Sequence, residues 1–331
     1  MARFLRTVVH QDVTLTAAAA PTEKNLGVNP ISFLLFTIRA ATLTVNVLPT
    51  LANLLGAVGN LEVLFKGTSI VAASLADHFR MCAALWGRWG IRENIDDDVN
   101  AVTFVTVPIP FSRIPYWNRE AFPASRAGDV VLKVTPAATF PGITTVTMQV
   151  EQVELLDAVP QQFLKYTTFP KTPTAVGEHD MDLPLGNPIL GALLFGTTVP
   201  TGTSFNASIA AVKMLVDNVE NYYSFANWES LHGDFLIRAH PEWELETVRF
   251  LENLAAAYTQ NVETGAPSDA QRIHRQYAYL DFDPLRNGMY QLETEGRGRV
   301  HLRITADVAD AIRMLPIELI KLPGAEAPAG G

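Results

Sequence analysis

Two stretches with one pattern show how this chain is built: GDVVLKV at residues 128–134 and GRVHLRI at residues 298–304. In each, a glycine and a charged residue precede apolar residues at every second position, and a threonine follows. Alternation with period two is typical of a β-strand that buries one face. One stretch lies in each half of the chain, which indicates a unit that occurs twice.

Other landmarks recur in the same order in both halves. They are residues 4–6 and 163–165 (FLR and FLK), 29–31 and 187–189 (NPI in both), 34–36 and 193–195 (LLF in both), and 63–67 and 214–218 (VLFKG and MLVDN). The last pair consists of strand-like runs, each ending in a residue that tolerates positive φ. The offset between matching positions changes from 159 to 151 and then to 170, so we expect a duplication with one deletion and one insertion.

The landmarks divide the chain into two domains and a tail. A strand-like run closes each half, at residues 146–156 and 312–322. We therefore predict a first domain over 1–159 and a second over 160–322, with an insertion at about 232–275. Residues 323–331 are low in complexity, and we expect them to be a flexible tail.

Strand signals dominate both halves. Residues 102–108 and 144–150 alternate with period two, and 21 prolines and 21 glycines punctuate the chain. Many short strands with few helices favour an all-β antiparallel sandwich in each half. Helical spacing of apolar residues predicts two helices, at 74–86 and 242–258. A short amphipathic segment over 222–231 matches the first helix in position.

Composition argues against several classes of protein. Hydrophobic residues make up 48% and charged residues 18%, which favours large buried surfaces in cores or between subunits. The net charge of −9 disfavours binding to phosphate backbones, so we expect no sequence-specific nucleic-acid partner. Cys82, the single cysteine, excludes an intrachain disulfide and is expected to be a small buried apolar residue.

The search for catalytic and metal-binding motifs finds little. The seven histidines form no H-x-H or H-E-x-x-H pattern, and no nucleophile elbow or phosphate-binding loop is present. Asp96, Asp97 and Asp98 could hold Ca²⁺, but a solvated turn is the simpler interpretation. The runs 178–180 (EHD) and 232–234 (HGD) are interpreted as polar loops, and 296–299 (GRGR) as a tight turn before a strand rather than a phosphate clamp.

Aromatic residues gather in two places, Trp86 with Trp89 and residues 222–228 with Tyr222, Tyr223, Phe225 and Trp228. Exposed rings in a row could stack on sugars, whereas buried rings would pack in the core or between subunits. Packing is the interpretation that we favour.

Several stretches resemble one family of viral proteins. Residues 182–189 (DLPLGNPI) look like the entry into a second jelly roll, and residues 279–284 (YLDFDP) with 298–304 look like its end. With the repeat and the insertion in its second half, the chain resembles the double jelly-roll major capsid proteins of tailless icosahedral viruses of the tectivirus, corticovirus and finnlakevirus types. The resemblance implies two tandem eight-stranded jelly-roll sandwiches with short helices and a helical insertion in the second.

The resemblance also implies binding partners and a location for the protein. It implies a homotrimer with a pseudo-hexameric outline that tiles an icosahedral bacteriophage shell, contacts with neighbouring capsomers and with penton or minor capsid proteins, and a location in the virion after assembly in the host cytoplasm. It implies no enzymatic activity and no cofactor. An internal lipid membrane could lie beneath such a shell, and Arg3 and Arg6 near the N-terminus are our candidates to face it.

Two other functions remain open. A carbohydrate-binding or adhesive sandwich protein, such as a virion spike, would expose a row of aromatic side chains. A jelly-roll hydrolase would need paired carboxylates, for which Glu151, Glu154 and Asp157 on an expected strand edge are the nearest set.

Overall fold

The structure is a computed structural model, and it describes residues 3–43, 50–88, 90, 93, 100–200, 204–239 and 274–323. By its internal contacts the chain forms two compact units. Unit 1 consists of Met1–Thr167 and Ile317–Gly331, and unit 2 of Thr168–Pro316. The sequence-based domain boundary, between residues 159 and 160, lies slightly before the first of these divisions.

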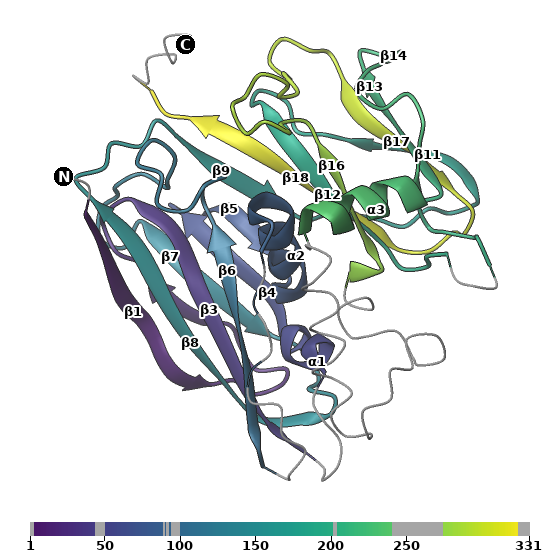
Figure 1. Ribbon diagram of the computed structural model, residues 1–331. Coiled ribbons are helices and arrows are strands. Elements are labelled where there is room, and N and C mark those ends of the chain that lie inside the picture. Colours follow the sequence, from purple (N-terminus) through teal and green to yellow (C-terminus); the bar gives the residue numbers. More distant parts are fainter. Residues whose placement is uncertain are drawn as a thin grey trace. The chain divides into compact units, whose positions relative to one another are not determined.

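Four long strands form the first sheet of unit 1 (Figure 1). Their order is β1-β8-β3-β6, and every neighbouring pair is antiparallel. The strands are β1 (Arg3–Thr14), β8 (Ile143–Leu156), β3 (Ile31–Thr42) and β6 (Val102–Pro110). Leu34, Phe36 and Ile38 alternate along β3 and are fully buried, as the period-two pattern requires.

The second set of strands in unit 1 has the order β2-β7-β4-β5, and it is one end of a nine-stranded sheet that continues from β5 to β9 (Gln162–Thr167). Its strands are β2 (Thr22–Asn25), β7 (Val130–Pro136), β4 (Val58–Phe65) and β5 (Thr68–Ala73). Strand β7 contains the first stretch quoted above, and Val130, Leu132 and Val134 are its buried face. Two four-stranded sheets connected in this order are a jelly roll. Two helices accompany them, α1 (Leu51–Gly56) and α2 (Leu75–Trp86).

The remaining strands repeat this order. Strands β9-β18-β12-β16 correspond to the first sheet, and β11-β17-β13-β14 to the second. Their bounds are β9 (Gln162–Thr167), β18 (Ile312–Lys321), β12 (Ile189–Gly196), β16 (Tyr277–Asp281), β11 (Gly177–Asp182), β17 (Val300–Ala306), β13 (Ala211–Val216) and β14 (Val219–Glu220), with the short β10 (Phe169–Lys171), β15 (Ala226–Asn227) and helix α3 (Trp228–Ala239) beside them. The fold is therefore a double jelly roll, as predicted.

Turn geometry repeats at the predicted spacing. Lys66 and Gly67 have φ of 51° and 82° and join β4 to β5, while Asp217 and Asn218 have φ of 51° and 65° and join β13 to β14. Two-residue loops with both φ values positive are type I′ hairpins. The backbone N–H of Lys66 donates to Asp129 O, and that of Asp217 donates to Arg299 O, both at 2.8 Å. The two donor residues, Lys66 and Asp217, differ by the offset of 151, and the two acceptor residues, Asp129 and Arg299, differ by the offset of 170.

Helix α2 agrees with its prediction at both ends. The Ser74 side chain accepts a hydrogen bond from the N–H of Asp77 at 3.1 Å, and Gly87 ends the helix with φ of 65°. The segment 222–231 was predicted less well, because α3 starts only at Trp228. Residues Ala226 and Asn227 pair first with β13, and this pairing delays the helix. The predicted helix at 242–258 lies outside the described residues, as do most of the insertion and the tail from residue 324.

Candidate functional site: a charged sheet face and an open edge strand

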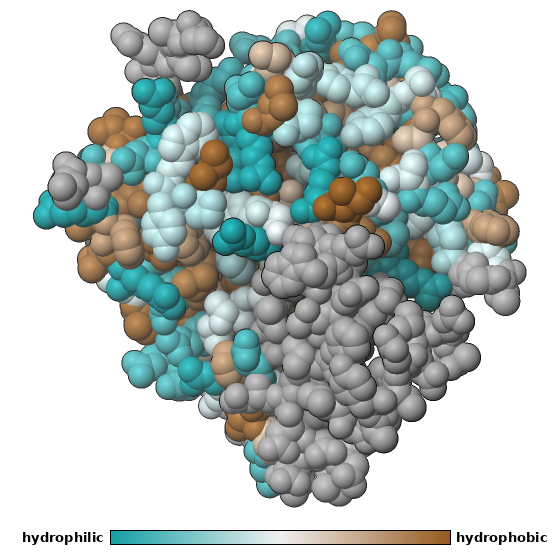
Figure 2. Space-filling view, viewed as in Figure 1, coloured by the Kyte–Doolittle hydropathy of each residue, from teal (hydrophilic) through white to brown (hydrophobic). Residues whose placement is uncertain are grey.

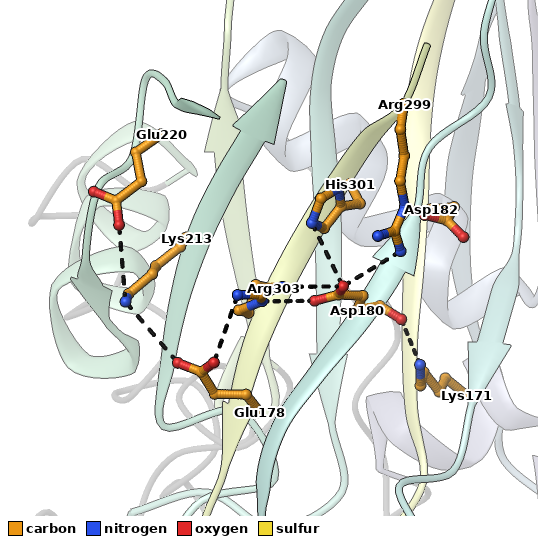
Figure 3. Close-up of polar contacts among 9 residues, drawn as sticks. All are labelled: Lys171, Glu178, Asp180, Asp182, Lys213, Glu220, Arg299, His301 and Arg303. Atoms are coloured by element: carbon orange, nitrogen blue, oxygen red, sulfur yellow. Dashed lines mark hydrogen bonds and ion pairs between the residues drawn. The ribbon is translucent and has the colours of Figure 1, made fainter. Parts of the chain in front are cut away.

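Oppositely charged side chains cover one face of the sheet formed by β11, β17 and β13 in unit 2 (Figure 3). Strand β11 contributes Glu178, Asp180 and Asp182, which alternate along the strand and so share a face. Strand β17 contributes His301 and Arg303, and Arg299, directly before the strand, has the same spacing. In the antiparallel register Asp180 lies opposite Arg303, and Asp182 lies opposite His301.

The contacts join these side chains into one network. Arg303 Nε donates to Asp180 Oδ1 at 2.8 Å, and Arg299 Nε donates to Asp182 Oδ1 at 2.7 Å. Arg299 also reaches Asp180, with 3.3 Å between Nη2 and Oδ2. The ammonium group of Lys213 on β13 lies between Glu178 at 3.9 Å and Glu220 at 3.8 Å. The network thus ties neighbouring strands together in one register.

The arginines set the protonation of this face. The hydrogen bond from Arg303 is the main reason why the pKa of the Asp180 carboxyl lies below its ordinary value. His301 is buried, and burial lowers its pKa although Asp180 Oδ2 lies 3.5 Å from its Nε2. His301 is therefore neutral at neutral pH, and Asp180 is ionised.

This arrangement suits strand pairing better than catalysis or metal binding. A general acid needs a carboxyl with a raised pKa, whereas that of Asp180 is lowered. Within the described part of the chain, no three His, Cys, Asp or Glu side chains are grouped so that they could hold a metal ion. The same part contains no helix long and apolar enough to cross a membrane.

The structure describes two of the five predicted site residues. Arg3 and Arg6 lie on β1, where Arg3 Nη2 donates to Asp157 Oδ2 at 2.8 Å and Arg6 donates to Glu151. Both arginines are exposed and both already have an acidic partner. The Ca²⁺ candidates Asp96, Asp97 and Asp98 lie outside the described residues.

Three local interpretations of the sequence were wrong. Residues 178–180 belong to strand β11, and residues 232–234 lie within α3, so neither is a loop. Glu151 and Glu154 are not on a sheet edge, because β8 has β1 on one side and β3 on the other. The charge alternation at 178, 180 and 182 and at 299, 301 and 303 was a signal for the charged face, and our search for motifs overlooked it.

Two further candidates are occupied by structural contacts. In the turn before β17, the backbone N–H groups of Gly298 and Arg299 donate to Asp217 Oδ1 at 2.9 and 3.1 Å, so a carboxylate takes the place that a phosphate would need. The aromatic residues at 222–228 do not form one exposed row, because Trp228 is buried while Tyr222 and Phe225 are exposed. Trp89 lies outside the described residues.

Strand β1 is an edge of its sheet with apolar side chains in solvent. Its one neighbour among the described strands is β8. Phe4, Leu5 and Val8 are 59%, 44% and 55% exposed. Hydrophobic side chains, brown in Figure 2, lie among hydrophilic ones along the left margin of the view, where Figure 1 places β1. An exposed apolar edge is typical of a surface that another chain covers.

Comparison with known proteins rests on structure. No family model matches the chain, and no curated protein matches it in sequence. Among solved structures, the chain is similar to the STIV MCP, with 11% identity, a TM-score of 0.65, and 99% of this chain and 100% of that chain covered. The chain has the fold of viral major capsid proteins.

Two more capsid proteins share this fold over most of their length. The major capsid protein P2 from bacteriophage PM2 has 10% identity and a TM-score of 0.56, with 99% of this chain and 100% of that chain covered. The Faustovirus major capsid protein has 9% identity and a TM-score of 0.55, with 97% of this chain and 90% of that chain covered. The double jelly roll is thus common to these proteins and this chain, although 9–11% of their residues are identical.

Proposed function

We propose that this chain is a major capsid protein. The observation that carries the proposal is the double jelly roll itself, which matches the solved major capsid proteins along nearly the whole chain. The exposed apolar edge of β1 supports it, because a shell subunit must bury surface against its neighbours. The charged side chains of β11 and β17 pair with one another across the sheet, which suits a structural role.

We further propose that three chains form one capsomer. Each chain supplies two jelly rolls of the same strand order, so three chains supply six similar lobes. Six lobes in a closed ring can contact six neighbours on a hexagonal lattice, which suits an icosahedral shell. In this proposal the two lobes of each chain correspond to the two domains predicted from the sequence, residues 1–159 and 160–322. In this proposal the protein is located in the virion, assembles in the host cytoplasm, and contacts other capsomers and penton or minor capsid proteins.

The alternatives have less support. A hydrolase would use a carboxyl with a raised pKa, and the pKa of Asp281 is raised because this residue is partly buried. Its oxygens, however, accept hydrogen bonds from Arg238 and from the backbone N–H of Asp283. A carbohydrate-binding protein would need a row of exposed rings, and within residues 222–228 Tyr222 and Phe225 are exposed while Trp228 is buried.

The solution mass of the purified chain tests the proposal. Light scattering at neutral pH should give about three times 36.2 kDa, and negative-stain images should show particles of near-hexagonal outline or larger sheets. A monomer at all concentrations up to those used for imaging would overturn the capsomer. In that case glycan arrays, with Tyr222→Ala and Phe225→Ala as controls, would test the carbohydrate-binding alternative.

We also propose that Arg3 and Arg6 face a lipid membrane beneath the shell. Basic side chains near an anionic surface are attracted to its headgroups, although Asp157 and Glu151 offset part of this attraction here. Replacing both arginines with glutamate should weaken binding to liposomes that contain anionic lipid. Binding that is unchanged, with the wild-type oligomer retained, would remove this part of the proposal.

A further inference from the structure

The first strands of the two jelly rolls, β1 and β9, have different numbers of neighbouring strands. Strand β9, which repeats β1, pairs with β18 on one side and with β5 on the other. The pairing with β5 is parallel and joins Val71 to Tyr166 and Ala72 to Thr167, all within unit 1. Strand β1 has β8 as its one neighbour among the described strands.

Equivalent side chains show what β1 lacks. At the repeat offset of 159, Phe4 corresponds to Phe163 and Leu5 to Leu164. Phe163 and Leu164 are 6% and 0% exposed, against 59% and 44% for Phe4 and Leu5. The same apolar sequence is thus buried in one half and left open in the other, which points to a missing neighbour beside β1.

The repeat also identifies that neighbour. Strand β5 is the strand that covers β9, and its equivalent in the second jelly roll is the segment 219–227 with β14 and β15. This segment is an open edge of its own sheet, and Val219 and Phe225 on it are 68% and 59% exposed. Among the described strands, β1 is therefore a first strand with one open side. The segment 219–227 is an open edge equivalent to β5, the strand that covers the first strand β9.

We propose that β1 of one copy pairs in parallel with the edge segment 219–227 of a second copy. This inference rests on the proposed capsomer and names its contact surface. Applying the offsets of 159 and 151 to the observed β5–β9 register places Thr7 beside Tyr222 and Val8 beside Tyr223. A contact between two different surfaces is head-to-tail, and such contacts form a ring when the rotation closes.

The exposed residues on the two edges are compatible with this pairing. In the parallel register Phe4 falls near Val219, so exposed apolar side chains cover one another. In the same register Leu5 falls beside Glu220 and Arg6 beside Asn221. Strand addition would give hydrogen-bond partners to the outward backbone groups of β14, whereas the N–H groups of Tyr222 and Tyr223 already donate to Asn221.

A pair of cysteines tests the contact. Phe4→Cys with Val219→Cys places two exposed thiols directly opposite each other in the expected register and on the same face, close enough for a disulfide if the strands pair. Cys82 is buried and does not interfere. Under mild oxidation the double variant should run as a covalent trimer on a non-reducing gel. A mixture of the two single variants should give dimers, because one link then joins two chains.

A matched pair serves as control. Val102→Cys with Val219→Cys uses a similarly exposed position on β6, the opposite edge of the same sheet, and should give no trimer band. Val8→Asp should also raise the concentration at which half the trimer dissociates by about tenfold or more, and Val102→Asp should leave it unchanged.

The outcomes separate this inference from the proposed function. If the wild type is monomeric, the capsomer itself fails. If the wild type is trimeric, but the Phe4–Val219 pair gives no covalent trimer or cross-links no better than the control, the capsomer stands and the β1 contact is wrong.

Discussion

At the scale of single residues, buried polar groups affect stability more than the many surface charges do. Arg113 and Glu120 form an ion pair in unit 1 with both side chains almost fully buried. Arg113 Nη2 donates to Glu120 Oε2 at 2.7 Å, and Gln162 Nε2 donates to the same oxygen at 3.0 Å. Glu120 therefore fixes the loop after β6 to the start of β9.

Glu120→Gln should destabilise the protein strongly, because it removes the carboxylate charge that pairs with the buried Arg113 guanidinium. We expect a loss of about 3–5 kcal/mol in the free energy of unfolding, measured by urea denaturation. Asp157→Asn is the matched control, since it breaks the exposed ion pair with Arg3 and should cause no measurable loss. Equal losses in both variants would contradict this account.

His78 should make stability depend on pH. Burial lowers its pKa to about 4, and its ring contacts are Tyr166 Oη at 3.3 Å and Leu61 O at 3.2 Å. An unfolded histidine has a pKa of about 6.5, so between these values the unfolded chain binds a proton that the folded chain does not. The contribution of His78 to the free energy of unfolding should therefore fall by about 3 kcal/mol in total as the pH drops from about 6.5 to about 4, and it should not change further below pH 4.

The variant His78→Gln provides the comparison for this histidine. Its stability at neutral pH should be lower, because the ring packing is lost, but its further decline between pH 6.5 and 4 should be smaller than that of the wild type. Denaturation midpoints recorded across this range measure the difference. Parallel curves for the two proteins would show that other groups cause the acid dependence.

At the scale of elements, the two type I′ hairpins show how the backbone conformation of a turn limits which residues it accepts. Gly67 has φ of 82° in the β4–β5 turn, and a Cβ atom added there would meet no atom within 4 Å. The cost of a side chain at this position is therefore conformational rather than steric. The equivalent turn uses Asn218, one of the few other residues that adopts this conformation readily.

Gly67→Ala should lower the free energy of unfolding by about 1–2 kcal/mol, because alanine resists positive φ. Gly56→Ala is a suitable control, since it lies at the end of α1 with equally open surroundings and no positive φ. Thermal denaturation of both variants measures the two losses. A loss at residue 56 as large as that at residue 67 would refute the conformational explanation.

At the scale of the whole molecule, unit 1 contains both the first 167 residues and the last segment of the chain, from Ile317 onward. Residues 317–321 of β18 pair with β9, and unit 1 contains both segments although all of unit 2 lies between them in the sequence. Ile317 and Leu319 are buried, so unit 1 depends on them for part of its core. Unit 1 is therefore built from two separate segments of the sequence, so the two units do not correspond to its two halves.

A fragment of residues 1–167 should fold poorly alone, because β9 would lose its β18 partner and expose Leu164 and Tyr166. Co-expression with residues 168–331 should restore a soluble, protease-resistant complex. Limited proteolysis and the dispersion of NMR amide signals measure this. A well-dispersed spectrum from the fragment alone, equal to that of the complex, would show that the N-terminal fragment is self-sufficient.

Local sequence is enough for the features that depend on near neighbours in the chain. The alternation at 128–134 and 298–304 fixes which side chains each strand can bury, and Ser74 and Gly87 fix the ends of α2. The repeated landmarks predicted the order of elements in both jelly rolls. The resemblance to double jelly-roll capsid proteins followed from these patterns.

Which strands become neighbours depends on the folded chain as a whole. FLR at residues 4–6 and FLK at 163–165 have nearly the same local preferences, yet β1 is an open edge and β9 is covered on both sides. The acidic residues of β11 and the basic residues of β17 come from distant parts of the chain, and only their pairing makes one charged face. Burial depends on contacts between distant segments, and no local pattern specifies these contacts.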